Sequence, residues 1–488
     1  MNTPPAAPAK KQKSTARRVL GWIAKAVLLI FVLLAATFAY YRLRGPTAEQ
    51  QAAMELMRKS YRPAQGVNAF PLLLRYDLPV EQLAAQMTAD AEKVRKRRDA
   101  MDDSNENVTD TPLLPEFSDA EEAALCNIWD EKNCLTWMAA HADAARPILA
   151  AHSVMVGRAQ ALERADFNLR PNDSDYYAGG LNHLVLNNGV AQTLWLNAFA
   201  LKYVDGDRAG ALAATCRNLA AWRRMGRNAH SVSSAQDARW NAVNAIRLYA
   251  TMLADLPPDA AVPEDCALAL QPVVAADVDE CAQMTGRFAD EERMFRDLEQ
   301  RSPDASWHQI LFRKAMFDMP QFLAWNAQYL ATACKSDTVA RQLADELPQR
   351  EKSRRFFSGA ISIPPGVKGP ECVANFGGCF LAEDCMTSMC GCALLCRSPP
   401  MQNHDAGVLD YAAYLRLAAT LLWLREHPEG SIEERFARRP AQLRSPHHAS
   451  GFDAANGVLY VENLPQEPWL MSSPDDEKRF ELPVAVPR

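Results

Sequence analysis

The stretch WLNAFALKYVDGDRAGALAATCRNLAAWRRM (Trp195–Met225) decides the fold class of this chain. Its first part completes a mostly apolar helix that begins at Leu181 and is broken after Val204 by Asp205-Gly206-Asp207. In its second part, apolar residues recur about every 3.6 residues, as on one face of an amphipathic helix. These residues are Leu212, Cys216, Leu219 and Trp222. Two helices joined by a short glycine-marked turn predict an antiparallel hairpin.

The same helical periodicity extends from residue 47 to residue 350. A third helix is predicted over Ser234–Leu253, with a capping box at Ser233-Ser234-Ala235-Gln236 and a stop at Pro257-Pro258. Its apolar stripe consists of Ala242, Ile246, Tyr249 and Leu253, and that of the next helix consists of Cys281, Met284, Phe288, Phe295 and Leu298. We therefore expect residues 42–350 to form a mainly α fold, a helical-hairpin bundle or a short α-solenoid.

A second informative stretch lies near the N-terminus, where Val19–Tyr41 is apolar over about the length that a helix needs to cross a bilayer. Basic residues and no acid precede it (Lys10, Lys11, Lys13, Arg17 and Arg18), which predicts that residues 1–18 stay in the cytoplasm. A cleavable signal peptide is the alternative, but the apolar run is longer than a typical h-region and ends in a poor cleavage site. We expect an uncleaved signal anchor at 19–41 in the inner membrane, with the bulk of the chain in the periplasm.

The rest of the chain is acidic. Residues 1–41 contain six basic residues and no acidic one, so a total net charge of −6 leaves −12 on residues 42–488. Such an ectodomain lacks the basic footprint that nucleic-acid binding needs, and it disfavours broad contact with anionic lipid. The expected partners are therefore the membrane, through one spanning helix, and an envelope protein, with no nucleic acid.

Half of the twelve cysteines fall in a segment rich in proline and glycine, residues 351–408. They are Cys372, Cys379, Cys385, Cys390, Cys392 and Cys396. A segment with few large apolar residues buries too little surface to hold itself together, so disulfides of undetermined connectivity are expected to stabilise this insertion. The spacing resembles that of the knotted three-disulfide miniproteins, although its last gap is shorter. Zinc is the alternative, but the spacing fits it poorly and no histidine lies among these cysteines.

The other six cysteines lie on or beside predicted helices. Cys126 and Cys134 are close enough in sequence to close a local loop. Pairing between neighbouring hairpins is one arrangement for the remaining four, Cys216, Cys266, Cys281 and Cys334. No C-x-x-C redox motif occurs in the chain. Structural disulfides agree with a periplasmic location, because disulfides persist in oxidising compartments.

A very apolar helix is predicted over Leu409–Leu424, in a segment of returning core helices at 409–439. Asp410 and Arg416 make its uncharged run too short for a second membrane span, so this helix is expected in the core. The tail, residues 440–488, is rich in proline, and its runs 457–461 and 480–486 predict two short strands. Adjacent His447 and His448 are interpreted as a solvated surface pair rather than a metal site.

Two resemblances rest on these parts. The hairpin is similar to a tetratricopeptide-type hairpin, because Tyr203, Gly206, Ala209 and Ala213 fall about where that motif has small or aromatic residues. No second copy follows at the same period, and ordinary helix-hairpin packing explains the same pattern. The order of the anchor, the Gly206-Asp207 hairpin ending in Trp222-Arg223-Arg224, and the late apolar helix resembles membrane-anchored helical envelope proteins of Gram-negative bacteria. This second resemblance implies an envelope location and no particular chemistry.

No catalytic, cofactor-binding or metal-binding motif emerges from the sequence, so no residue is assigned to such a role. The nine histidines stand in no metal-ligand spacing, and G-x-S-x-G, S-x-x-K, Walker and G-x-G-x-x-G motifs do not occur. The leading hypothesis is a non-enzymatic binding or scaffold protein of the bacterial envelope, because stacked helical hairpins present extended surfaces. The alternatives are an envelope enzyme acting on cell-wall or glycan material and an immunity or inhibitor protein that binds through Cys372–Cys396.

Overall fold

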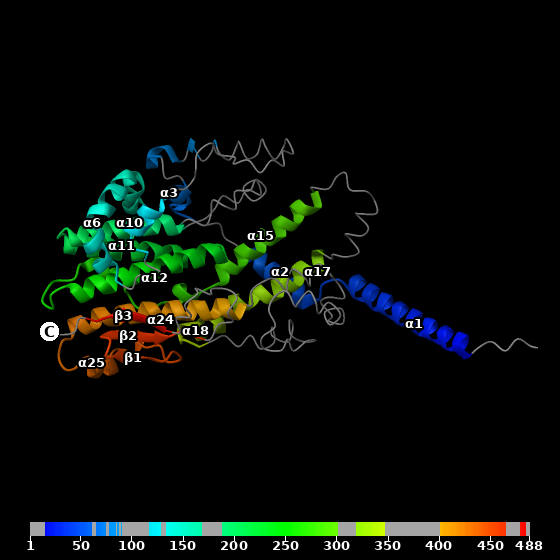
Figure 1. Cartoon of the computed structure of the whole chain (residues 1–488). Coiled ribbons are helices and arrows are strands. Elements are labelled where there is room, and N and C mark those ends of the chain that lie inside the picture. Colours follow the sequence, from blue (N-terminus) through cyan, green and yellow to red (C-terminus); the bar gives the residue numbers. More distant parts are fainter. Residues whose placement is uncertain are drawn as a thin grey trace, which may run out of the picture. The chain divides into compact units, whose positions relative to one another are not determined.

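The structure, a computed structural model, describes residues 15–60, 65–74, 78–83, 85–86, 89, 117–127, 133–167, 188–300, 319–346, 401–464 and 479–484. These residues are mostly helical, with a small antiparallel sheet near the C-terminus (Figure 1). The predicted fold class, mainly α with minor β at the C-terminus, is therefore confirmed.

The longer helices are α1 (Thr15–Arg44), α2 (Ala48–Ser60), α6 (Cys134–Ala151), α10 (Asn188–Val204), α11 (Arg208–Arg227), α12 (Val232–Asp255), α15 (Cys281–Gln300), α17 (Met319–Leu330), α18 (Ser336–Leu343) and α24 (Met401–Glu426). The shorter helices are α3 (Phe70–Leu74), α5 (Asp119–Ala124), α7 (Ser153–Gly157), α8 (Ala159–Leu162), α13 (Glu264–Ala269), α14 (Ala275–Val278) and α25 (Ile432–Arg438). Two 3-10 turns, η2 (Ala331–Cys334) and η3 (Ala441–Leu443), complete the helical elements described.

The chain divides into two compact units, and the smaller one contains the N-terminal residues as far as Gln51 and the beginning of α17. In this unit α1 ends at Arg44 because Gly45 adopts a left-handed conformation (φ 67°) and Pro46 follows it. Thr47 begins α2 as its N-cap, since its backbone N–H donates to the side-chain oxygen of Gln50 at 2.8 Å. The hydroxyl of Thr47 in turn accepts from the backbone N–H of Gln50 at 3.3 Å.

The larger unit contains a bundle in which α6, α10, α11, α12 and α24 pack side by side (Figure 1). The predicted hairpin is α10 and α11. Gly206 takes the positive φ of 103° that the turn requires, and the side chain of Asp207 caps α11 by accepting from the N–H of Gly210. Trp195, Trp222 and Tyr249 are fully buried in the core between these helices.

The beginning of α12 differs from the prediction. The helix starts at Val232, and its N-cap is Ser231, whose hydroxyl accepts from the backbone N–H of Ser234 at 3.1 Å. The predicted capping box at Ser233 was wrong, because Ser231, Ser233 and Ser234 give the same local signal and the helix uses the earliest of them. The predicted stripe Ala242, Ile246, Tyr249 and Leu253 is buried as expected.

The predicted apolar helix is α24, which begins eight residues earlier than expected, at Met401. The sheet has the order β1-β2-β3, with β1 (Ser450–Asp453), β2 (Val458–Glu462) and β3 (Arg479–Pro483). The two predicted strands, β2 and β3, pair antiparallel with Val461 opposite Phe480. The sheet contacts α24 and α12, so it lies along the helical body. The sequence missed β1, because its four residues, Ser-Gly-Phe-Asp, carry too short a pattern to show alternation.

Candidate functional site

Helix α1 exposes its apolar side chains instead of burying them. It is 30 residues long. Nine of its large apolar residues are each more than half exposed: Val19, Trp22, Ile23, Val27, Leu28, Leu29, Ile30, Val32 and Leu33. A contiguous apolar surface of this kind marks a site of contact with lipid or with another protein.

A second long apolar helix behaves in the opposite way. Among the described residues, the segment Ala406–Glu426 of α24 is the one with the length and hydropathy of a membrane span, and 83% of its apolar 18-residue window is buried inside the protein. The described apolar run of α1, Gly21–Ile30, falls short of that length. Because α24 packs against α12 and the sheet, its apolar surface is used within the fold.

Six cysteines lie among the described residues, and the structure joins them in three disulfides. Cys126 is joined to Cys134 with a Cα–Cα distance of 5.5 Å. Cys216 of α11 is joined to Cys266 of α13, and Cys281 at the start of α15 is joined to Cys334 at the end of η2. The last two bonds link segments 50 and 53 residues apart, so they tie neighbouring helices together. The six cysteines of the insertion, Cys372, Cys379, Cys385, Cys390, Cys392 and Cys396, lie outside the described residues.

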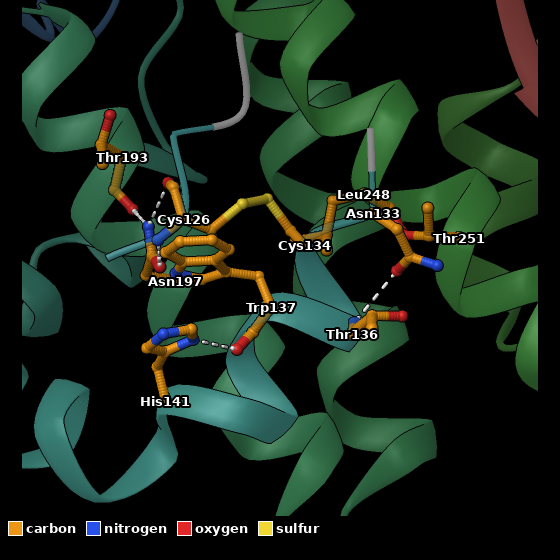
Figure 2. Close-up of a disulfide and its surroundings, with 10 residues drawn as sticks. All are labelled: Cys126, Asn133, Cys134, Thr136, Trp137, His141, Thr193, Asn197, Leu248 and Thr251. Carbon is orange, nitrogen blue, oxygen red and sulfur yellow. Dashed lines mark hydrogen bonds between the residues drawn. A yellow bond between two sulfur atoms is a disulfide. The ribbon is translucent and has the colours of Figure 1, made fainter. Parts of the chain in front are cut away.

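Figure 2 shows how the Cys126–Cys134 disulfide is held against α10. The side-chain oxygen of Asn197 accepts from the backbone N–H of Cys126 at 2.7 Å, and its Nδ2 donates to the carbonyl of Cys126 at 3.0 Å. Nδ2 also donates to the carbonyl of Thr193 at 2.8 Å. The N-cap of α6 is Asn133, whose side chain accepts from the backbone N–H of Thr136. These bonds satisfy every backbone polar group of Cys126 and fix both ends of the disulfide loop.

The larger unit also contains a buried group of four charged side chains, which we call the His448 clamp: Asp345, Asp410, Arg416 and His448. His448 Nδ1 is 2.9 Å from Asp345 Oδ2, and its Nε2 is 3.0 Å from Asp410 Oδ1. Arg416 donates from Nη1 to Asp345 Oδ1 at 3.2 Å and from Nη2 to the carbonyl of Leu343 at 2.8 Å. The side chains of His448 and Asp345 are both 0% exposed.

Backbone groups complete the clamp. The N–H of His447 donates to Asp345 Oδ2 at 3.0 Å, and the N–H of Leu464 donates to Asp410 Oδ1 at 2.9 Å. Asp345 has a positive φ of 66°, a conformation that costs energy for a residue with a Cβ. The contacts with His448 and Arg416 keep Asp345 in this backbone conformation. The clamp thus joins the end of α18, the middle of α24 and both ends of the loop and strand segment 447–464.

The prediction that His447 and His448 form a solvated surface pair was wrong for His448, which is 5% exposed. Burial alone would lower the pKa of His448, but the hydrogen bonds to Asp345 and Asp410 outweigh this effect and raise the pKa to about 9. The imidazole is therefore charged at neutral pH, with both nitrogens donating to carboxylates. A histidine in this state acts as a structural cation and cannot serve as a general base.

A second buried ion group occupies the end of α11. Arg223 makes a bidentate pair with Asp277, at 2.9 Å and 2.8 Å, and Arg227 contacts the same carboxylate at 2.7 Å. Burial would raise the pKa of Asp277, but these hydrogen bonds lower it. Arg223 also donates to the carbonyls of Ala269, Gln271 and Pro272. The Trp222-Arg223-Arg224 sequence that carried the resemblance therefore has packing and ion-pairing roles here.

Neither buried group has the geometry of a metal site. No cluster of three or more His, Cys, Asp or Glu side chains in the described part of the chain is arranged to hold a metal ion. In the clamp, the two carboxylates lie on opposite nitrogens of the imidazole, so the three side chains do not converge on one point. The sequence did not predict the clamp, because its four residues are far apart in the chain. The one local signal was Asp410 and Arg416 in an otherwise apolar helix, since buried charges need partners.

The His448 clamp joins residues that flank, in the sequence, the segment containing most of the cysteine-rich insertion. Residues 347–400, which include most of that insertion, fall between the described ends of α18 and α24. Asp345 precedes this segment and Asp410 follows it, and one imidazolium contacts both. The clamp therefore connects described residues that lie on either side of this segment in the sequence.

Comparison with known proteins gives no relative: the chain matches no protein-family model, no curated protein and no solved structure.

Proposed function

We propose that this protein is anchored in the bacterial inner membrane by α1 and acts in the envelope as a non-enzymatic binding or scaffold protein. The observation that carries the membrane part is the exposed apolar surface of α1. A helix of 30 residues is about 45 Å long, which exceeds the roughly 30 Å of hydrocarbon in a bilayer. Exposing this apolar surface to water costs free energy, whereas contact with lipid acyl chains does not.

Charge and cysteine chemistry support the proposed orientation. The basic residues that precede the apolar run favour a cytoplasmic N-terminus, because such residues are retained on the cytoplasmic side. The three disulfides between described residues favour an oxidising compartment for the ectodomain. Both arguments favour a periplasmic location for the bulk of the chain.

The helical bundle supports a binding or scaffold role, since helical hairpins offer extended surfaces for contact with a partner. The His448 clamp favours a second candidate in particular, an immunity or inhibitor protein that presents the segment Cys372–Cys396. A link between the residues that flank an insertion restricts its conformations, and so lowers the entropy lost when it binds a partner. In this candidate the helical body acts as the support and the insertion makes the contact.

Topology is tested with alkaline phosphatase, which is active only in the periplasm, fused after Arg488 of the full chain. We expect an active fusion that stays with the membranes after high-salt washing. Leu28→Arg inserts a charge near the middle of the apolar run and is expected to reduce membrane insertion, because the substitution costs about 3 kcal/mol or more. Leu56→Arg in α2 is the matched control, since Leu56 is also exposed but lies outside the run. An inactive fusion, or free thiols at the three disulfides in the native protein, would contradict the proposal.

The binding role is tested by crosslinking in the native envelope, followed by purification of the chain and identification of the proteins attached to it. A reproducible partner in near-stoichiometric amount is the expected result. Loss of this partner on deletion of residues 372–396 would favour the immunity or inhibitor candidate. Failure to capture any protein with several crosslinkers would contradict the scaffold role and direct attention to cell-wall hydrolase activity.

A further inference from the structure

The segment that follows the start of α25 is basic in an otherwise acidic ectodomain. Residues 435–452 contain four arginines, two histidines and no acidic residue. Two of these arginines, Arg439 and Arg444, follow the C-terminal end of α25. Arg439 is partly buried and Arg444 is exposed.

Backbone carbonyls hold the guanidinium group of Arg444 in place, and carbonyls together with two side chains hold that of Arg439. Arg439 stacks on the ring of Phe436, with its guanidinium carbon 3.6 Å from the ring centroid, and donates to the carbonyl of Phe436 at 2.8 Å. It also donates to the carbonyl of Leu443 and to the hydroxyl of Ser450. Arg444 donates to the carbonyls of Arg439 and Ala437 at 3.0 Å and 3.2 Å. These bonds use only part of the five N–H donors that each guanidinium offers.

The positive charge of the pair is not balanced by a carboxylate among the described residues. Several other surface arginines do have acidic partners, as in the pairs Arg146–Asp205, Arg208–Asp255 and Arg479–Asp453. Burial, together with the positive charge of Arg444, lowers the pKa of Arg439 to about 10. The carbonyls at the end of α25 compensate only in part, because a helix terminus carries about half an elementary charge.

We propose that Arg439 and Arg444 form a binding site for an oxyanion, a phosphate or carboxylate group carried by a ligand in the envelope. Two positioned guanidinium groups with unused donors match the paired oxygens of such a group. An anion there would also relieve the repulsion between the two arginines. This proposal deepens the binding function above and rests on it for the site's biological role, but the binding itself does not depend on the membrane topology.

The site is tested by isothermal titration of the full chain in detergent with inorganic phosphate and, separately, with acetate, at constant ionic strength with chloride. We expect saturable binding of at least one of the two, and the stronger binder identifies the source as phosphoryl or carboxylate. Arg444→Gln is expected to weaken binding about tenfold or more, because a hydrogen bond to a charged group is lost. Arg444→Lys keeps the charge but not the forked geometry, so its affinity should lie between those of the unaltered chain and Arg444→Gln.

Arg146→Gln is the matched control, since Arg146 is also exposed but is paired with Asp205, and it should bind as the unaltered protein does. The proposal is overturned if neither anion binds, or if Arg444→Gln binds as tightly as the unaltered chain. It is also overturned if binding appears only after Asp475, Asp476 and Glu477 are replaced by their amides, because the chain's own carboxylates would then occupy the pair. If the phosphatase fusion is inactive but the chain binds the anion as expected, the membrane proposal is contradicted and the proposed anion site is not.

Discussion

Replacing His448 with glutamine tests the electrostatic role of the His448 clamp. In the folded protein the imidazole lies between two buried carboxylates, and its pKa is raised from 6.5 to about 9. A shift of this size corresponds to about 3 kcal/mol of stabilisation. Because the folded-state pKa is the higher one, this stabilisation is complete below pH 6.5 and is lost as the pH rises through about 9.

The variant removes the cation while Asp345 and Asp410 stay buried. At about pH 6 we expect His448→Gln to lower the free energy of unfolding by about 3–5 kcal/mol, the usual cost of breaking a buried ion pair. At about pH 9.5 the imidazole of the unaltered protein is largely neutral, so the difference between the two proteins should shrink by about 3 kcal/mol. Arg416 still pairs with Asp345 in the variant, which limits the loss.

The assay is urea unfolding of the full chain in detergent micelles, with disulfides intact, followed by circular dichroism at both pH values. His427→Gln is the matched control, because His427 is an exposed histidine whose ring stacks on Trp423 at 4.6 Å. It should leave the pH dependence unchanged. A pH-independent difference between His448→Gln and the unaltered protein would refute the reasoning, as would a variant that is as stable as the unaltered protein at about pH 6.

Two further predictions concern packing and cross-linking. A Cβ on Gly286 would lie 1.5 Å from the backbone oxygen of His230, so Gly286→Ala should destabilise the protein by about 1–3 kcal/mol or more. Gly407→Ala meets nothing within 4 Å and should be neutral or stabilise α24 by up to about 1 kcal/mol; equal denaturation midpoints for the two variants would contradict this account. Replacing Cys216 and Cys266 with alanine opens a loop of 50 residues and should cost about 4 kcal/mol in urea unfolding. The same change at Cys126 and Cys134, only 8 residues apart, should cost about 2.5 kcal/mol, and the reverse order would argue against the loop-entropy explanation.

The sequence predicted the local features of the fold, namely the buried helix faces and the turns. The stripe Ala242, Ile246, Tyr249 and Leu253 predicted the buried face of α12, and Asp205-Gly206-Asp207 predicted the turn between α10 and α11. Such signals are local, because helix periodicity and turn chemistry depend on neighbours within about four residues. The three serines at the start of α12 show the limit of these signals, since they predicted the existence of the cap but not its position.

The buried charges were decided by tertiary structure alone. His448 looks like a surface residue in a proline-rich loop, and it becomes a buried cation because Asp345, 103 residues earlier, and Asp410, 38 residues earlier, meet it in the fold. The partners of Cys216 and Cys281 were likewise fixed by helix packing. The sequence by itself determined which segments are helical and which faces are apolar. Tertiary structure decided which charges and thiols meet, because the free energy of a buried ion pair or cross-link depends on distances that no local pattern encodes.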